Sequence, residues 1–469
     1  MARIARPLSN DLVRAIRLAA QGMANVPGAP VARVVARSGF VRTLGGAEAY
    51  LGVRARQRTM HRPALELSVD RGDLQVLPAV RGCIYLVPRE DAALCLRIAA
   101  RLSKARVDRE LRRAGVTPRE LAATAQQALA TLRHGPLGTT ALRKAMPEDA
   151  VRSLGDAGRK VGIGSTLPPA LRELEFAGAI ERAPEGGRLD TERYLWRVTA
   201  GGPFAAVDVP DDPVEQAAML LERFVRWTGV ATLVQFQAWS GLTAREARAA
   251  VPRSDVVPAA AVEATGTVLC SPHLDELLHL EPAVAHATAF LPFEDNLVHL
   301  FGGAGHLCDP EFLDLPVPGW GRGAAGRGDG ATTLRTASHP ALRPLIADGR
   351  LSGFWEYDPD AGVAVPSCFR TPSRQAQVLI EELSASTSAF LREELGHGRS
   401  FSLDTDDDLR RRLALLRTIG GAPRRRPARA AKVATAKAKA KAKARRQAAD
   451  TTPAPAKKAP ARTRPTNRR

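Results

Sequence analysis

The first part of this chain contains the segment Leu74-Gln75-Val76-Leu77-Pro78-Ala79-Val80-Arg81-Gly82-Cys83-Ile84-Tyr85-Leu86-Val87, from which its fold can be predicted. Two short apolar runs, residues 74–77 and 83–87, flank a segment that contains proline and glycine and has Arg81 near its tip. Such a pattern is typical of a β-hairpin. Because helical patterns precede this hairpin, the order of the elements predicts a winged helix.

Three helices are predicted upstream of the hairpin, and the sequence gives bounds for the first two. Ser9 can cap a helix whose apolar residues recur at helical spacing and which ends near Gly22. A second helix begins at Val31 and breaks at Gly39. Together with the hairpin and the helix after it, these elements predict a winged-helix unit over residues 8–110.

The same order of elements recurs in the second part of the chain. Pro184-Glu185-Gly186-Gly187 has the composition of a hairpin turn, and short apolar runs lie on both sides of it. Three helical patterns precede this hairpin, so the order predicts a second winged-helix unit over residues 111–205. The predicted helices cover residues 118–132, 139–146 and 166–176, and the predicted strands cover residues 179–182 and 194–198.

A third winged-helix unit is predicted over residues 211–285, where three helical patterns lead to a less clear hairpin of residues 256–262 with 265–270. Beyond it, Asp348-Gly349 between two apolar runs is typical of a tight hairpin turn, and helical patterns follow. This part predicts a small β-rich C-terminal domain with helices over residues 286–420. The predicted fold class is therefore α+β, with three tandem winged-helix domains, the β-rich domain and a disordered basic tail.

The basic tail, residues 421–469, contains seventeen Lys and Arg against one acid, Asp450, and carries +16 of the formal net charge of +19. Such a segment, with almost no large apolar residue, cannot bury enough surface to offset its ordering entropy. We expect a disordered arm that binds the phosphates of double-stranded DNA without sequence preference, and a solubilising spacer is the alternative. Its predicted DNA-binding residues are Arg424, Arg425, Arg426, Lys437, Lys439, Lys441, Lys443, Arg445 and Arg446.

The cysteines and the apolar runs exclude several classes of protein. No Cys-x-x-Cys pair occurs, which argues against a disulfide framework and a structural zinc site. No run is long enough to span a bilayer, and the first residues lack the apolar region of a signal peptide. We expect a cytoplasmic, nucleoid-associated protein without a membrane partner. The five cysteines are Cys83, Cys95, Cys270, Cys308 and Cys368.

No metal and no nucleotide cofactor are predicted. His273 and His279 are six residues apart, a spacing that does not bring them to one face of a helix. His299 and His306 could approach a metal, yet no second cluster accompanies them. The glycine-rich residues 302–305 lack the following helix and the downstream acid of a dinucleotide-binding turn.

Four stretches of this chain occur in an order known from one protein family. They are residues 80–87, residues 225–229 with 236–242, residues 291–295, and residues 348–350 with 353–355. They resemble four motifs of the AlkZ/YcaQ-like DNA glycosylases. Residues 80–87 are similar to an Arg-Gly-Thr-Leu-His-Leu strand, and residues 225–229 with 236–242 are similar to a Tyr-Gly-Pro and Asp-Phe-Ala-x-Trp-Ser-Gly-Leu pair. Residues 291–295 resemble a Leu-Pro-x-x-Asp turn, and residues 348–350 with 353–355 resemble an Asp-Gly-Arg-x-x-Gly-x-Trp hairpin. That family consists of tandem winged-helix proteins that excise alkylated bases and unhook interstrand crosslinks. The resemblance covers about residues 8–395.

The catalytic signature of that family, Gln-x-Gln or Gln-x-Asp, is not matched. Members carry it upstream of an aromatic-Leu-x-x-x-Ala-Arg stretch that looks like residues 50–56 here. Depending on register, the signature falls on Arg42-Thr43-Leu44 or on Gly45-Gly46-Ala47, and neither contains a carboxylate or an amide. Hydrolysis of an N-glycosidic bond needs such a group to activate water. The candidate catalytic residues are Glu48, just downstream, and Tyr85, which stands where the family's strand has histidine; ordinary structural roles are the alternative.

Winged helices contact DNA through their third helix and their wing. We therefore expect a winged-helix DNA-binding protein related to DNA glycosylases acting on alkylated or crosslinked bases, with enzymatic activity left open by the unmatched signature. The competing hypothesis is a non-catalytic nucleoid-associated or transcription-regulatory DNA-binding protein. The predicted contacts before the tail are Arg42, Arg54, Arg56, Arg58, Arg81, Arg172, Arg182 and Arg188.

Overall fold

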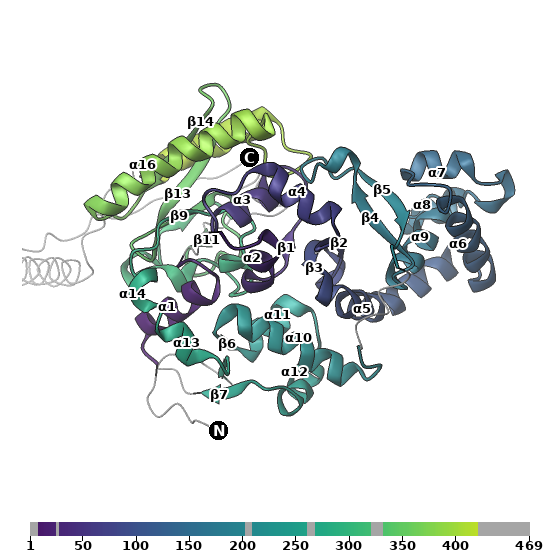
Figure 1. The fold of residues 1–469 in the computed structure, drawn as a ribbon, viewed down its shortest axis with the longest axis horizontal. Coiled ribbons are helices and arrows are strands. Elements are labelled where there is room, and N and C mark those ends of the chain that lie inside the picture. The colour runs from purple at the N-terminus through teal and green to yellow at the C-terminus, as the bar shows by residue number, and fades with distance from the viewer. Residues whose placement is uncertain (1–7, 25–27, 202–208, 260–267, 320–331, 421–469) are drawn as a thin grey trace, which may run out of the picture. The chain divides into compact units, whose positions relative to one another are not determined.

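The first two predicted hairpins join in one five-stranded sheet. In the computed structural model, β2 (Leu74–Pro78) pairs antiparallel with β3 (Ile84–Pro88), and β4 (Ile180–Pro184) pairs antiparallel with β5 (Tyr194–Val198). β2 also pairs with β4, and β1 (Val41–Arg42) adds to β3, so the strand order is β1-β3-β2-β4-β5 (Figure 1). The two hairpins thus form where the sequence predicts them and build a common sheet.

The structure describes residues 8–24, 28–201, 209–259, 268–319 and 332–420. The basic tail, residues 421–469, lies outside the described residues. The described ranges all belong to one compact unit, Met1–Gly421. Within these ranges, no helix is both long enough and apolar enough to cross a membrane.

Four helices precede the first hairpin, one more than the sequence predicts, and the first two lie where their patterns place them. The Ser9 side chain accepts a hydrogen bond of 3.3 Å from the amide of Leu12 and caps α1. Gly39, with φ of 97°, ends α2 in a conformation that favours glycine. The helices of this part are α1 (Asn10–Ala20), α2 (Val31–Ser38), α3 (Glu48–Arg54), α4 (Arg62–Asp70) and α5 (Ala92–Arg113).

Four helices lie between α5 and the second hairpin, one more than the sequence predicts. The Thr117 side chain accepts a hydrogen bond of 3.2 Å from the amide of Glu120 and so caps α6. The additional helix, α8, contains Gly155 and Gly158, which weaken the helical pattern in the sequence. The four helices are α6 (Pro118–Leu132), α7 (Thr139–Ala145), α8 (Gly155–Val161) and α9 (Leu167–Phe176).

The third part consists of three helices and a three-stranded sheet of order β6-β8-β7. β7 (Val257–Ala259) and β8 (Val268–Cys270) pair antiparallel as the predicted hairpin does, while residues 260–267 between them lie outside the described ranges. β6 (Val230–Thr232), which the sequence did not predict, pairs with the other side of β8. The helices are α10 (Pro213–Thr228), α11 (Leu233–Ser240) and α12 (Ala244–Ala250).

The C-terminal part is built around a four-stranded antiparallel sheet of order β14-β13-β12-β9. Asp348 and Gly349, with φ of 52° and 63°, form the tight turn that the sequence predicts between β12 and β13. Mixed helices and sheets of this kind confirm the α+β class. The strands are β9 (Ala289–Phe290), β12 (Arg343–Ala347), β13 (Arg350–Asp358) and β14 (Val363–Cys368).

Helices close this C-terminal part. α16 lies along β14 (Figure 1), where the Ser388 hydroxyl accepts a hydrogen bond of 2.8 Å from the amide of Ala364. α17 packs against β13, because its Arg412 pairs with Glu356 at 2.7 Å. The remaining elements are α13 (Leu274–Leu278), α14 (Glu281–Val284), α15 (Asn296–His299), β10 (Pro316–Val317), β11 (Thr332–Thr333), α16 (Arg374–Ala389), which continues in a π-helical segment Phe390–Leu395, and α17 (Asp406–Gly420).

Buried aromatic rings join the first and third parts of the chain. The ring of Phe40, after α2, lies 4.6 Å from that of Trp227 in α10, and the ring of Trp227 lies 5.6 Å from that of Trp239 in α11. Phe224 and Phe236 extend this cluster at 5.4 Å. The core is therefore continuous between two of the predicted winged-helix units, whose boundaries stay predictions.

The loop before α3 is held from two sides. The amide of Ala47 donates to the carbonyl of Arg399 at 2.7 Å, and the amide of Ser402 donates to the carbonyl of Leu44 at 3.0 Å. The amide of Gly46 donates to the carbonyl of Asp190 at 2.7 Å. Hydrogen bonds from segments far apart in the sequence thus hold the loop of residues 44–47. This loop contains residues 45–47, one of the two possible positions of the family signature.

Gly46→Ala is expected to destabilise the protein by roughly 2–4 kcal/mol. Gly46 has φ of 59°, and a Cβ at this position would lie 2.5 Å from the carbonyl oxygen of Arg399. Urea unfolding of the variant measures the loss. Gly28→Ala is the matched control, because Gly28 has φ of 76° but no heavy atom within 4 Å of an added Cβ. Equal losses in both variants would show that the contacts that hold this loop contribute nothing.

Candidate functional site

Side chains from distant parts of the chain converge on the residues around the end of α2. The indole of Trp227 donates to the carbonyl of Ala36 at 2.8 Å. The side-chain amide of Asn296 donates to the carbonyls of Ser38 and Phe40 at 2.9 and 3.0 Å. Trp227 belongs to one of the stretches that resemble the glycosylase family, and Asn296 directly follows another. Both therefore hold residues 36–40, which lead into the position of the family's catalytic signature.

Arg56 is buried and binds side chains inside the protein. Its guanidinium forms two hydrogen bonds with the carboxylate of Asp295 and one of 3.0 Å with the side-chain oxygen of Gln21. Only 4% of Arg56 is exposed. Asp295 is also committed, because it accepts a hydrogen bond of 2.8 Å from the amide of Leu297 and caps α15. The expectation that Arg56 contacts DNA is corrected here, since all of this guanidinium is used inside the protein.

A small cavity lies among these residues. Its volume is about 10 Å³, roughly the space that one water molecule needs. Three carboxylates and two guanidinium groups lie in its wall beside the apolar side chains of Val41 and Pro292. A cavity of this size with several polar groups in its wall can hold one water molecule. The lining includes Arg42, Glu48, Arg56, Glu294, Asp295 and Asn296.

Glu294 forms the centre of a charged cluster at this cavity. Its Oε2 lies 2.7 Å from Nη1 of Arg42 and 3.0 Å from Nε2 of His299. Arg42 and His299 also approach each other, at 3.1 Å. The rings of His299 and His339 meet edge to face at 4.7 Å, and the Arg42 guanidinium lies 5.8 Å from the centre of the Tyr85 ring.

The cluster keeps Glu294 ionised. Burial by itself raises the pKa of this carboxyl, but the hydrogen bond from His299 and the charges of His299 and Arg42 outweigh it, so the pKa lies below its ordinary value. The pKa of His339 is also lowered, by burial and by the neighbouring His299 and Arg42. At neutral pH Glu294 is therefore a carboxylate beside a cavity the size of a water molecule.

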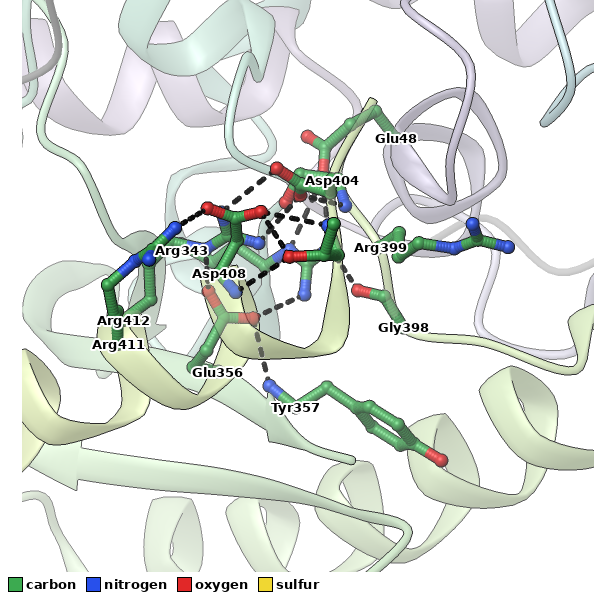
Figure 2. A network of polar contacts seen from close by, with 12 residues as sticks. Glu48, Arg343, Glu356, Tyr357, Gly398, Arg399, Asp404, Asp408, Arg411 and Arg412 are labelled. Atoms are coloured by element: carbon green, nitrogen blue, oxygen red, sulfur yellow. Dashed lines mark hydrogen bonds and ion pairs between the residues drawn. The ribbon is translucent and has the colours of Figure 1, made fainter. Parts of the chain in front are cut away.

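Glu48, a predicted catalytic residue, lies in a different network (Figure 2). Its Oε1 accepts a hydrogen bond of 3.2 Å from Nη2 of Arg343, and its Oε2 accepts one of 3.2 Å from the amide of Glu294. Arg343 pairs with Glu356 at 2.6 Å, and Glu356 pairs with Arg412, which also pairs with Asp404. The structure places Glu48 in this buried network, with 2% of the residue exposed.

The network contains one carboxyl group more than it has guanidinium groups. Glu48, Glu356 and Asp404 face Arg343 and Arg412, so full ionisation leaves an uncompensated negative charge. Burial, offset in part by Arg343 and by backbone amides, raises the pKa of Glu48 to about 6. Glu48 therefore takes up a proton at a higher pH than an ordinary glutamate does.

Glu48→Gln is expected to change the pH dependence of folding. The folded-state pKa of about 6 exceeds the ordinary value of 4.5, so the proton on Glu48 stabilises the fold below about pH 4.5, and this contribution is lost as the pH rises through 6. The stability of the glutamine variant relative to the parent should rise by about 2 kcal/mol between pH 4.5 and 7. Urea unfolding across this range measures it. Glu276→Gln, at a side chain that is 79% exposed, should show no such change, and a flat difference for Glu48→Gln would contradict the expectation.

Tyr85, the second predicted catalytic residue, is packed into the core. Only 2% of it is exposed, and its ring lies 6.4 Å from that of Phe40. Burial raises the pKa of its hydroxyl, so the phenol stays protonated at neutral pH. Its nearness to Arg42 places Tyr85 in the wall of the charged cluster.

The other predicted DNA contacts fall into two groups. Arg81, at the tip of the first hairpin, and Arg172, on α9, are exposed, and no carboxylate within the described ranges pairs with either. The remaining four are partly buried and bound to the protein. Arg54 donates to the carbonyl of Met60, Arg58 donates to that of Thr288, Arg182 pairs with Glu175 and Arg188 pairs with Asp190. The predicted contacts in the tail, including Arg424 and Lys437, lie outside the described residues.

Three residues of the charged cluster, Glu294, His299 and His339, are not among the site residues that the sequence predicts, whereas Arg42 and Tyr85 are. In the sequence, Glu294 is part of the Leu-Pro-x-x-Asp turn, and His299 stands without a second cluster of metal ligands. The sequence does place a second carboxylate, Glu294, directly before Asp295, and this pair is the feature that could have indicated a site. Nothing in the sequence indicates a role for His339. No group of three or more histidine, cysteine or acidic residues in the described part of the chain is arranged to hold a metal ion.

Comparisons with known proteins agree with the resemblance of the four stretches. A family model described as DNA glycosylase AlkZ-like matches residues 35–396. Among solved structures, Streptomyces sahachiroi DNA glycosylase AlkZ has a similar fold, with a TM-score of 0.60 and 20% sequence identity over 84% of this chain and 98% of that chain. A search of curated protein sequences found no match. Since the family model spans most of the chain, this protein belongs to the AlkZ-like DNA glycosylase family.

Proposed function

We propose that this protein is a DNA-repair glycosylase that binds double-stranded DNA and releases alkylated or crosslinked bases. Family membership supports the reaction type, and the water-sized cavity beside the ionised Glu294 carries the proposal, because hydrolysis of an N-glycosidic bond requires a bound water and a carboxylate or amide. The protein would act as three tandem winged helices with a basic arm, at the nucleoid in the cytoplasm.

The DNA-binding surface that we propose starts from Arg81 and Arg172. Both are exposed, one at a hairpin tip and one on the helix that precedes the second hairpin, which are the positions that enter grooves in winged helices. Arg81 also has φ of 57°, a left-handed conformation that a large side chain adopts only at a cost. A strained, exposed arginine at a wing tip is consistent with a role in binding phosphate.

Arg81→Asn is expected to weaken binding to duplex DNA by about fivefold and to reduce the salt slope by about one, as loss of one phosphate contact does. Stability should be kept or slightly increased, since asparagine tolerates the left-handed conformation better than arginine. Fluorescence anisotropy at several salt concentrations measures the affinity. Arg374→Asn, at an exposed position at the start of α16, serves as the control. Equal affinity of the Arg81 variant and the parent would exclude the wing tip as a contact.

Base release tests the proposed reaction. Duplex DNA that carries 7-methylguanine, or a nitrogen-mustard crosslink, is incubated with excess protein, and the free base and the abasic site are quantified. We expect release above the spontaneous rate. The amount of bound DNA is measured in the same samples, so that absence of product is not confused with absence of binding.

The second candidate function is a non-catalytic DNA-binding protein. The observation that favours it is the unmatched signature, because neither residues 42–44 nor residues 45–47 offer a carboxylate or an amide. Tight binding to duplex DNA with no base release at high protein concentration would support this function and exclude the glycosylase.

A further inference from the structure

We infer that Glu294 supplies the carboxylate that activates water in this chain, in place of the residues of the unmatched family signature. The inference rests on the proposed glycosylase function and names the catalytic residue of that site. Three observations support it. Glu294 lines the cavity, Arg42 and His299 lie beside its carboxylate, and the other two carboxylates of the cavity are bound to arginines that hold the fold.

Three carboxylates line the cavity, and two of them are fully engaged in holding the fold. Asp295 binds Arg56 through both oxygens and caps α15. Glu48 binds Arg343, of which 0% is exposed, and accepts from the amide of Glu294. Glu294 remains, and its partners belong to a cluster that reaches the surface.

Arg42 and His299 position the Glu294 carboxylate. Both lie close to the same oxygen, Oε2, as ion-pair partners at 2.7 and 3.0 Å. Among the described residues, Nε of Arg42 and Oε2 of Glu294 are buried and have no hydrogen-bond partner. A water molecule in the adjoining cavity would satisfy both groups, since it would accept from Nε and donate to Oε2. An unsatisfied buried donor is costly, which favours a bound water at this place.

The reaction is a hydrolysis in which this water is the nucleophile. Its oxygen forms a bond to C1′ of the damaged nucleotide, and the bond from C1′ to the base nitrogen breaks with its electron pair leaving on the base. Glu294 accepts the proton that the water loses and later passes it to solvent. For a cationic N7-alkylated purine, the products are a neutral free base and an abasic sugar with a hydroxyl group at C1′, so charge and atoms balance without a further reactant.

Part of the charged cluster is exposed at the surface of the protein. The cavity has room for a water but not for a base, so an extruded nucleotide would bind outside it, and Arg42 and His339 are the partly exposed residues of the cluster that it would meet. Arg81 lies close enough to His339 to lower its pKa. The proposed wing contact and the proposed catalytic carboxylate therefore belong to neighbouring parts of one surface.

The test compares Glu294→Gln with the parent in single-turnover release of 7-methylguanine from duplex DNA. Loss of the proton acceptor is expected to slow release by about 10²–10⁴-fold. Glutamine keeps the size and one acceptor oxygen of the side chain, so DNA affinity and the urea unfolding midpoint should stay close to those of the parent. Glu294→Asp, which keeps the carboxylate, is expected to retain more activity than glutamine and covers the case in which the glutamine variant does not fold. Glu276→Gln is the matched control at an exposed glutamate.

The outcomes separate the inference from the proposed function. Release by the parent that falls in Glu294→Gln, with folding and binding intact, supports both. Release that is unchanged in this variant, or that is lost in Glu48→Gln instead, overturns the assignment of Glu294 and leaves the glycosylase. No release by the parent overturns both. The pH profile adds a second readout, because the acid limb that protonation of Glu294 produces should disappear in the glutamine variant.

Discussion

Deletion of residues 421–469 is expected to weaken binding to duplex DNA strongly and to flatten its dependence on salt. The segment holds seventeen of the 68 Lys and Arg residues, and the chain before it has a net charge of only +3. If six to ten of these charges meet phosphates, the intact protein loses about 10³–10⁵-fold in affinity between 50 and 200 mM salt, and the truncated protein loses much less. Anisotropy titrations of both proteins at four or more salt concentrations measure the two slopes.

A charge-neutral tail is the control for this deletion. Replacement of every Lys and Arg after Gly420 by Gln keeps the length of the segment and removes its charge. If the tail binds phosphate, this variant behaves as the truncated protein does. If the tail is only a spacer, the variant behaves as the parent does, and equal slopes in all three proteins would refute the role of the arm. The folded part should be unaffected, because α17 ends at Gly420.

Replacement of Arg343 by methionine is expected to destabilise the protein by about 3–5 kcal/mol, the cost of breaking a buried ion pair from one side. None of Arg343 is exposed, and it binds Glu48, Glu356 and the carbonyl of Gly398. Methionine fills part of the volume but leaves Glu48 without a cationic partner. Glu356 keeps its ion pair with Arg412, so it loses less stabilisation than Glu48 does. Urea unfolding at pH 7 measures the change.

Two further variants show whether the charge itself is responsible. Arg410 lies on the same helix as Arg412 and forms a solvent-exposed ion pair with Asp360. Arg410→Met removes this pair and should cost much less stability than Arg343→Met, because water screens an exposed pair. The double variant Arg343→Met with Glu48→Gln should recover part of the loss, since the unpaired carboxylate is then absent. A loss below about 1 kcal/mol for Arg343→Met, or no recovery in the double variant, would contradict a network held by charge.

This network also connects the family region with the end of the folded part. Glu48, Arg343 and Glu356 lie within the matched residues 35–396, whereas Asp404 and Arg412 lie after them. Arg399 and Ser402, also after residue 396, bind the loop before α3. The segment from residue 397 to α17 therefore completes the packing of the candidate site and leads directly into the basic tail.

Local patterns in the sequence predicted most elements. The cap at Ser9, the stop at Gly39 and the turn at Asp348-Gly349 depend on neighbouring residues, and each lies where its pattern indicated. The strand β14 was missed because Pro366 argues against a strand. The structure accommodates this proline because β14 is the edge of its sheet.

The candidate site shows the opposite case. The fold class, the family and the absence of the family's signature could be read from the sequence alone, since they depend on residue types and on their local order. The burial of Glu48 in an ion-pair network could be seen only in the folded protein, because its partner Arg343 lies 295 residues away. The folded protein likewise shows that Glu294, Arg42 and His299 share one cluster. Burial and long-range pairing set the pKa and the availability of a carboxylate, and neither can be read from the neighbours of that residue in the chain.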